Sequence, residues 1–110
     1  MPTVNVYFKK LPDSKFDTIV SDLKVFLAEK LTCGDIKLSP EEVSVRFIKI
    51  DGGDMIGDAE VEISAASFSE RVSKQDEICL DVAKYIDEIA PHLGDVKVWL
   101  KLSELGHSWE

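Results

Sequence analysis

The feature that most limits the fold is a hydrophobic period that changes from two residues to about 3.6 and back. Residues 2–8 alternate apolar and polar side chains, which is typical of a strand with two unlike faces. From Phe16 to Leu31 the apolar side chains recur at steps of three and four, as on one face of a helix. Residues 43–50 alternate again and are rich in β-branched side chains. The first half therefore predicts a strand, a helix and a second strand.

The second half of the chain repeats this order. Residues 59–66 alternate as a third strand. Residues 70–90 carry an apolar stripe at helical spacing, which Pro91 ends because proline cannot donate the helical hydrogen bond. Residues 96–102 alternate as a fourth strand. A strand that returns through a crossover helix to lie beside its predecessor makes a parallel pair.

The pattern predicts an α/β protein of the α+β kind, with duplicated β-α-β units, a four-stranded mixed sheet and two helices on one face. We expect a single domain over residues 1–110, with its units at about 1–50 and 59–102. Two helices can cover only one face of four strands. Because the strands also carry Tyr7 and Trp99, we expect the opposite face to be partly buried against other subunits.

Charge and composition narrow the class of partner. Thirteen basic residues against 21 acidic ones give a formal net charge of −8. Nucleic acids and anionic membranes need clustered Lys and Arg, so the sequence predicts neither partner. The chain opens directly into a strand pattern rather than a signal peptide, and no apolar run approaches the roughly 20 residues that span a bilayer. We therefore expect a cytoplasmic protein.

Metal and nucleophile motifs are missing from the sequence. Cys33 and Cys79 have neither metal-ligand spacing nor the pattern of a disulfide framework, and we interpret both as small buried side chains. His92 and His107 are isolated from any third ligand. There is no glycine-rich phosphate loop and no serine nucleophile motif. The sequence predicts no metal and no cofactor.

Four further features carry a resemblance to a known family. The chain begins Met1-Pro2 and enters a strand at once, and its length and duplicated β-α-β order match two-unit family members. Residues 40–48, Pro-Glu-Glu-Val-Ser-Val-Arg-Phe-Ile, are similar to the family's second strand with its Arg. Residues 95–100, followed by Gly106 and Trp109, are similar to its last strand and tail. On these residues the chain resembles the tautomerase superfamily, which contains macrophage migration inhibitory factor and 4-oxalocrotonate tautomerase. It also resembles uncharacterised bacterial members of that kind.

The resemblance implies that Pro2 is the catalytic base. Removal of Met1 would leave Pro2 with a secondary amine, and a free α-amino group titrates near about 7.7–8.0. Burial disfavours the ammonium form and so lowers that pKa. A neutral amine can take a proton from the carbon beside a carbonyl and return it elsewhere, which is keto–enol tautomerisation. A chain that keeps Met1 has an amide at Pro2 and no such base.

The resemblance also implies substrate-binding residues. Arg46 matches the family's strand Arg, whose planar fork suits a carboxylate, although it could equally be a solvated strand residue. Arg71 stands at a helix start, where the helix dipole disfavours a cation, so a functional role or an intersubunit pair is expected. Lys37 lies one position from the family's substrate-facing Lys, and the main chain at Ala66 corresponds to a backbone contact. The remaining candidates are apolar or aromatic wall residues: Trp99, Met55 and Ile56.

These expectations lead to one function and two alternatives. The leading hypothesis is a cofactor-independent tautomerase or isomerase of small 2-oxo or enol acids that works as a homotrimer with sites between subunits. The first alternative is a non-catalytic protein of the same fold with a structural or protein-interaction role. The second is hydration chemistry of the dehalogenase type, in which Glu104 or Asp54 would activate water.

Overall fold

The computed structural model describes residues 2–9, 16–32, 37–55 and 57–103. Its strands are β1 (Thr3–Phe8), β2 (Ser44–Lys49), β3 (Ala59–Ala66) and β4 (Val96–Ser103). Its α-helices are α1 (Phe16–Leu31), α2 (Ser69–Ser73) and α3 (Gln75–Ile89), and two short 3-10 helices, η2 (Pro40–Glu42) and η3 (Pro91–Leu93), precede β2 and β4.

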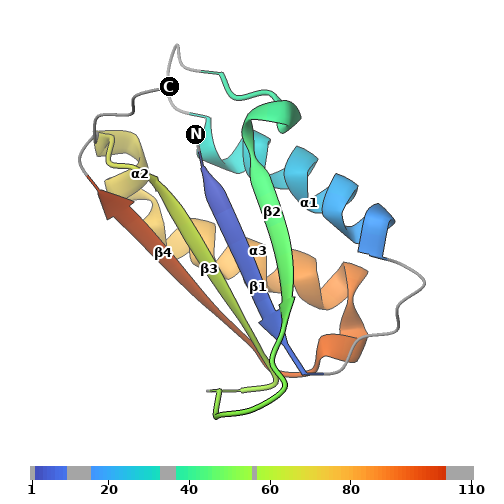
Figure 1. The fold of residues 1–110 in the computed structure, drawn as a ribbon. Coiled ribbons are helices and arrows are strands. Elements are labelled where there is room, and N and C mark those ends of the chain that lie inside the picture. The colour runs from blue at the N-terminus through green and yellow to red at the C-terminus, as the bar shows by residue number, and fades with distance from the viewer. Residues whose placement is uncertain (1, 10–15, 33–36, 56, 104–110) are drawn as a thin grey trace, which may run out of the picture.

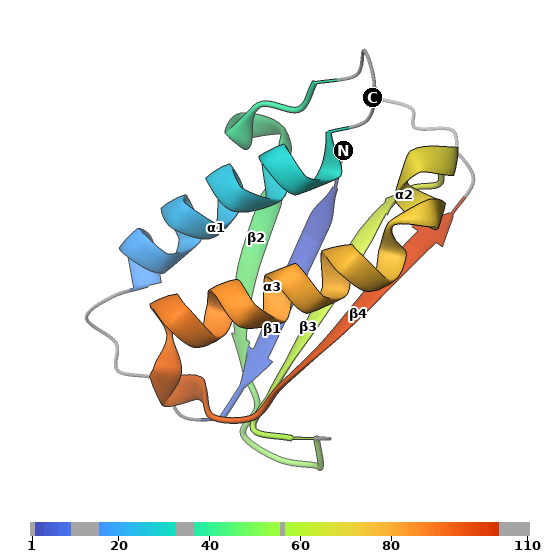
Figure 2. The ribbon, with the colours of Figure 1, turned by 180° about the vertical axis from the view of Figure 1, so that it is seen from behind.

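The four strands form one mixed sheet in the order β2-β1-β3-β4. β1 is parallel to β2, β3 is parallel to β4, and β1 and β3 meet antiparallel in the middle. The long helices α1 and α3 lie across the same face of this sheet (Figure 2). The predicted fold class is therefore confirmed, including the parallel pair within each β-α-β unit.

The core lies between the helices and the face of the sheet that they cover. Val4 and Val6 of β1 and Val61 and Ile63 of β3 are fully buried there. They meet apolar side chains from the helices, of which Leu23, Leu27 and Val82 have no exposed surface. Burial of each such side chain contributes about 1.5–3 kcal/mol. The hydrophobic pattern of the strands thus decides which face of the sheet receives the helices.

The helix predicted over residues 70–90 is divided in two. Lys74, with φ −111° and ψ 11°, separates α2 from α3. The two segments differ in the kind of side chain that they bury: α2 buries the charged Arg71, whereas α3 buries the apolar Ile78, Val82 and Ile86. A straight helix would keep a single buried stripe, so the break at Lys74 lets α2 turn toward the end of α1 while α3 lies across the sheet (Figure 1).

In the described part of the chain no helix covers the other face of the sheet, and we call this face the open face (Figure 1). Its residues alternate with the core residues along each strand. The open face holds Thr3, Asn5 and Tyr7 of β1, Ser44, Arg46 and Ile48 of β2, Glu60, Glu62 and Ser64 of β3, and Lys97, Trp99 and Lys101 of β4. Trp99 exposes 41% of its surface, which is unusual for so large an aromatic residue.

Candidate functional site

Pro2 lies at the end of the sheet where β1 begins. It is buried, and it has the same alternation as the core residues Val4 and Val6. Its carbonyl accepts a hydrogen bond from the Ser44 main-chain N–H at 3.1 Å, which continues the β1–β2 pairing by one residue. The backbone of Pro2 is therefore fixed beside the start of β2, with its ring on the core side of the sheet.

Arg71 lies at the same end of the sheet, and its guanidinium is bound to main-chain carbonyls. The side chain is only 3% exposed. Its Nε and Nη2 donate to the Leu31 carbonyl at 3.0 and 2.8 Å, and its Nη1 donates to the Ala66 carbonyl at 2.9 Å. The Phe68 ring centroid lies 4.9 Å from its Cζ, within cation–π range. Arg71 thus joins the last residue of α1 to the last residue of β3.

This contact explains why a cation is placed at the start of a helix. Arg71 is the third residue of α2, a helix of only five residues, so it also belongs to the last turn and the dipole of α2 opposes it little. The partner is instead the C-terminal end of α1, a 16-residue helix whose last carbonyls have no helical donor. The expectation of a substrate or intersubunit partner for Arg71 did not consider this intramolecular one.

Ala66 and Lys37 belong to the same end of the molecule. The β1–β3 pairing ends with Thr3 opposite Ser64, so Ala66 continues past the start of β1, where its carbonyl meets Arg71. Lys37 is exposed, and the adjacent Leu38 N–H donates to the Thr32 hydroxyl at 3.3 Å, which holds this segment against the end of α1. The start of β1, the end of β3, α2 and the segment leading to η2 lie at one end of the sheet (Figure 1). The structure therefore brings Pro2, Ala66, Arg71 and Lys37 to this end.

Arg46 does not join this group within one chain. It is exposed on the open face, and its Cα partner in β1 is Asn5. Asn5 lies three residues from Pro2 along the strand, which is about 10 Å, and on the opposite face. An Arg46 guanidinium near a Pro2 nitrogen would therefore have to come from another subunit.

The wall candidates are also separated from Pro2. Trp99 is on the open face of β4, opposite Glu62 in β3. Met55 is half-buried in the loop between β2 and β3, at the far end of the sheet from Pro2 (Figure 1). Ile56 lies outside the described residues, as do Glu104 and His107. Asp54 is exposed in the same loop as Met55.

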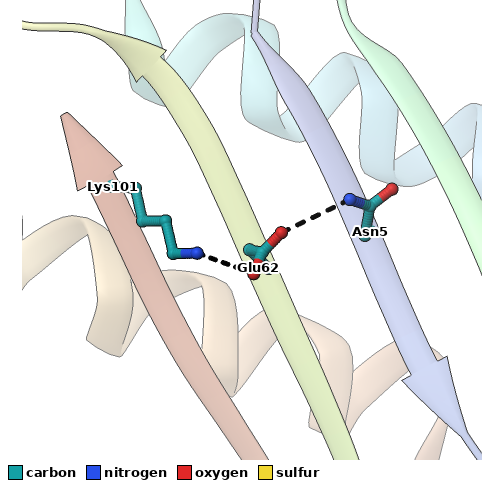
Figure 3. Close-up of polar contacts among 3 residues, drawn as sticks. All are labelled: Asn5, Glu62 and Lys101. Atoms are coloured by element: carbon teal, nitrogen blue, oxygen red, sulfur yellow. Dashed lines mark hydrogen bonds and ion pairs between the residues drawn. The ribbon is translucent and has the colours of Figure 1, made fainter. Parts of the chain in front are cut away.

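The open face carries a row of three hydrogen-bonded polar side chains, and the sequence did not reveal this row. Glu62 accepts from Lys101 Nζ at 2.9 Å and from Asn5 Nδ2 at 3.4 Å, so the three residues link β1, β3 and β4 (Figure 3). The Lys101 bond first, and the Asn5 bond after it, hold the pKa of Glu62 below its usual range. Only the strand order places these residues side by side, because 57 positions separate Asn5 from Glu62.

Sequence reasoning also missed the partners of Arg71. The Leu31 carbonyl and the Phe68 ring come from segments far from one another in the sequence, and a main-chain acceptor leaves no mark on residue identity. One signal was available: a basic residue at a helix start is unfavourable there and so requires a partner elsewhere.

Metal-binding and membrane-spanning features were searched in the described residues. No group of three or more His, Cys, Asp or Glu side chains that could hold a metal is found among them. None of the helices there is both long and apolar enough to cross a bilayer. Cys79 is half-buried, and burial is the main cause that raises the pKa of its thiol, which disfavours the reactive thiolate. Cys33 lies outside the described part of the chain.

Strand order 2-1-3-4, two parallel pairs joined antiparallel, and helices on a single face together define an α+β fold of duplicated β-α-β units. Several solved structures that resemble this chain in fold over nearly its whole length are of tautomerase-superfamily proteins. No family model and no curated protein matches the sequence.

Three solved structures illustrate the likeness. A macrophage migration inhibitory factor-like protein of Entamoeba histolytica has a TM-score of 0.66 at 11% identity, with 97% of this chain and 95% of that chain covered. A 5-carboxymethyl-2-hydroxymuconate delta-isomerase gives 0.62 at 10% identity, covering 100% and 86%. A member of the cis-3-chloroacrylic acid dehalogenase family gives 0.61 at 15% identity, covering 93% and 75%. These TM-scores demonstrate a common fold. At identities this low they show nothing about activity, which has to be inferred from the residues of this chain.

Proposed function

We propose that this protein is a cofactor-independent tautomerase or isomerase of small 2-oxo or enol acids, with Pro2 as general base after removal of Met1. The observation that carries the proposal is the burial of Pro2 immediately before the central strand β1. Its ring is on the core side, and its main chain is fixed by the hydrogen bond from Ser44. A buried amine favours its neutral form, which is the form that accepts a proton.

The proposed reaction moves one proton and changes no oxidation state. The Pro2 nitrogen accepts a proton from the enol oxygen or from the carbon next to the carbonyl. The electron pair shifts through the three-atom enol system, and the proton returns to the other end of that system. Arg71 and Lys37 supply positive charge at this end of the sheet, which favours an anionic substrate and the negative charge that develops in the intermediate.

The proposal includes a homotrimer. Within one chain Arg46, Trp99 and Met55 are distant from Pro2, so they can take part in its site only from a neighbouring subunit. The part of the open face over β2, where Ile48 is half-buried, is the surface that other subunits would partly cover. We place the protein in the cytoplasm, and we propose no nucleic-acid or membrane partner, in keeping with its net charge of −8.

A non-catalytic protein of the same fold is the second candidate. One observation favours it: three N–H groups of Arg71 already donate to main-chain carbonyls, and Arg46 lies on the other face. The cations best suited to a substrate carboxylate are thus committed or distant in a single chain. Such a protein would keep the fold and the assembly but lack turnover.

The test is the ketonisation of phenylenolpyruvate, followed by ultraviolet absorbance, with protein whose N-terminus is verified by mass as Pro2. We expect a rate above buffer, and a loss of about a hundredfold or more when the same chain keeps Met1, because the amide nitrogen is no longer a base. Pro2→Ala, which leaves a primary amine, should fall between the two forms.

Pro91→Ala is the matched control, because Pro91 is exposed at the far end of the molecule and its replacement should leave the rate unchanged. Equal rates for the Met1-retained and Pro2-terminated forms would remove Pro2 from the mechanism. No rate from the Pro2-terminated form with several enol acids would favour the non-catalytic candidate.

A further inference from the structure

The open face of the sheet also has a hollow. Its volume is about 290 Å³, and it is lined by Tyr7, Glu60, Glu62, Trp99 and Lys101 from the strands β1, β3 and β4. All five residues alternate away from the core, so the hollow and the Pro2 ring lie on opposite faces of the sheet. The hollow is therefore a separate candidate site.

The polar part of the hollow is negatively charged and held in place. Glu60 and Glu62 contribute two carboxylates, and Lys101 contributes one ammonium, which leaves the lining with one net negative charge. The Lys101 ammonium is engaged by Glu62 at 2.9 Å, and Asn5 holds the second oxygen of the same carboxylate (Figure 3). Glu62 is ionised at neutral pH like any ordinary carboxyl, and its lowered pKa, caused first by the Lys101 bond, extends the ionised form to more acidic conditions.

The apolar part of the hollow is aromatic. In the register of the sheet Tyr7 faces Glu60, and Glu62 faces Trp99, so the two rings flank the two carboxylates diagonally across β3. The negative faces of Tyr and Trp rings attract cations, most strongly when a carboxylate lies nearby. Trp99 is 41% exposed, so its indole is accessible to a ligand.

We propose that this hollow binds a compact organic cation, an ammonium group carried on a small apolar body. The ammonium would lie between the aromatic rings and donate to the carboxylate of Glu60, while the apolar body would cover the exposed Trp99 ring. The volume is at the lower limit of small-molecule sites and fits a ligand with one aromatic ring. The net charge of −8 over the whole chain also favours a positively charged ligand.

The experiment compares three isosteres that differ in charge: phenethylammonium, neutral 2-phenylethanol and anionic 3-phenylpropionate. Main-chain amide shifts of β3 and β4 are followed by NMR in the full chain. We expect phenethylammonium to saturate with a Kd of about 1 mM or below. The other two compounds should bind at least severalfold more weakly, and added salt should weaken only the ammonium.

Variants separate the two parts of the site. Glu60→Gln and Trp99→Leu should each weaken phenethylammonium severalfold or more, whereas Glu88→Gln, an exposed acid on α3, should change nothing. Pro2→Ala should also bind normally, so loss of tautomerase activity and loss of this site can be told apart. If Glu60→Gln fails to fold, Trp99→Leu provides the test, and if Trp99→Leu fails to fold, Glu60→Gln provides it.

Three outcomes would overturn the proposal. One is the absence of saturable shifts with phenethylammonium. Another is equal binding of all three isosteres, which would make the hollow a plain apolar surface. The last is a Trp99 indole shielded from acrylamide quenching, measured in a Trp109→Phe background, which would mean that a second copy of the chain fills the hollow.

Discussion

At the scale of single residues, Arg71 shows how a buried charge is accommodated without a nearby carboxylate in its described contacts. Its guanidinium meets two carbonyls and one ring, all of which carry partial negative charge toward it. The Leu31 carbonyl is also the negative end of α1, which adds to the attraction. The hydrogen bond from Nη1 also fixes the Ala66 carbonyl at the end of β3, at the end of the sheet where β1 begins.

Replacement of Arg71 should therefore destabilise the fold. In Arg71→Met the buried Leu31 and Ala66 carbonyls lose their donors, and we expect the free energy of unfolding to fall by about 3 kcal/mol. Lys74→Met, which alters an exposed neighbour, should change it by less than about 0.5 kcal/mol. Chemical denaturation measures both variants, and an unchanged midpoint for Arg71→Met would contradict the assignment.

Glu62 carries a pH dependence with a definite sign. Its pKa is lower in the folded chain than in the unfolded one, chiefly because of Lys101. The stabilisation is therefore complete above the unfolded pKa of about 4.3 and is lost as the pH falls through the lower, folded pKa. We expect acid unfolding of Glu62→Gln to show a weaker loss of stability below about pH 4.3 than the parent chain. Identical acid transitions, compared with Glu88→Gln as the control, would contradict this prediction.

At the scale of elements, one stacked aromatic pair forms part of the contact between α1 and α3. Phe26 and Tyr85 stack with ring centroids 4.0 Å apart and planes at 3°. The Tyr85 hydroxyl donates to the Asp22 carbonyl at 3.3 Å, and Lys30 pairs with Asp81 at 3.1 Å beside the rings. The helices α1 and α3 belong to different β-α-β units and lie on the same face of the sheet (Figure 2). The aromatic pair therefore contributes to the connection between the two halves.

Variants of Tyr85 should separate the ring from the hydroxyl. Tyr85→Ala removes the stack and part of the buried area, and we expect a loss of about 2 kcal/mol in the free energy of unfolding. Tyr85→Phe keeps the stack and should cost about 0.5 kcal/mol, and Lys30→Ala should cost less than about 1 kcal/mol. Thermal or chemical unfolding measures the series; a Tyr85→Phe variant as unstable as Tyr85→Ala would show that the hydroxyl dominates.

At the scale of the whole molecule, the open face is the surface that remains to be explained. It combines an exposed Trp99, a half-buried Ile48 and paired charges, a composition typical of interfaces. The proposed trimer would cover it in part, while the organic-cation site requires that the hollow between Tyr7 and Trp99 stays open.

Sedimentation should give three times the mass of one chain at micromolar concentration. We expect Ile48→Glu, on the open face, to dissociate the assembly because it places a charge among half-buried side chains. Val25→Glu is the matched control on α1, where Val25 is 55% exposed on the opposite side of the molecule. A monomeric parent chain, or an assembly that Ile48→Glu leaves intact, would contradict this use of the open face.

The sequence by itself determined the elements and the class of fold. Alternation in residues 59–66 and the helical stripe from Phe16 to Leu31 match β3 and α1 because each pattern reflects which side of one local element is buried. The parallel pairing within each unit followed from the length of the crossover. The resemblance to the tautomerase superfamily rested in part on the same order, together with Met1-Pro2, residues 40–48 and the last strand with its tail, and the structural likeness supports it.

Only the tertiary structure decided which candidate residues share a site. Arg46 and Pro2 lie on opposite faces because side chains alternate between the two faces along a strand. Only the burial of Pro2 and the pairing of Arg46 with Asn5 fix which face each residue takes. The Arg71 contacts and the Asn5–Glu62–Lys101 row join residues distant in sequence through carbonyls and through strand order. Neither leaves a local periodicity, because both depend on how separate elements pack rather than on how any one of them forms.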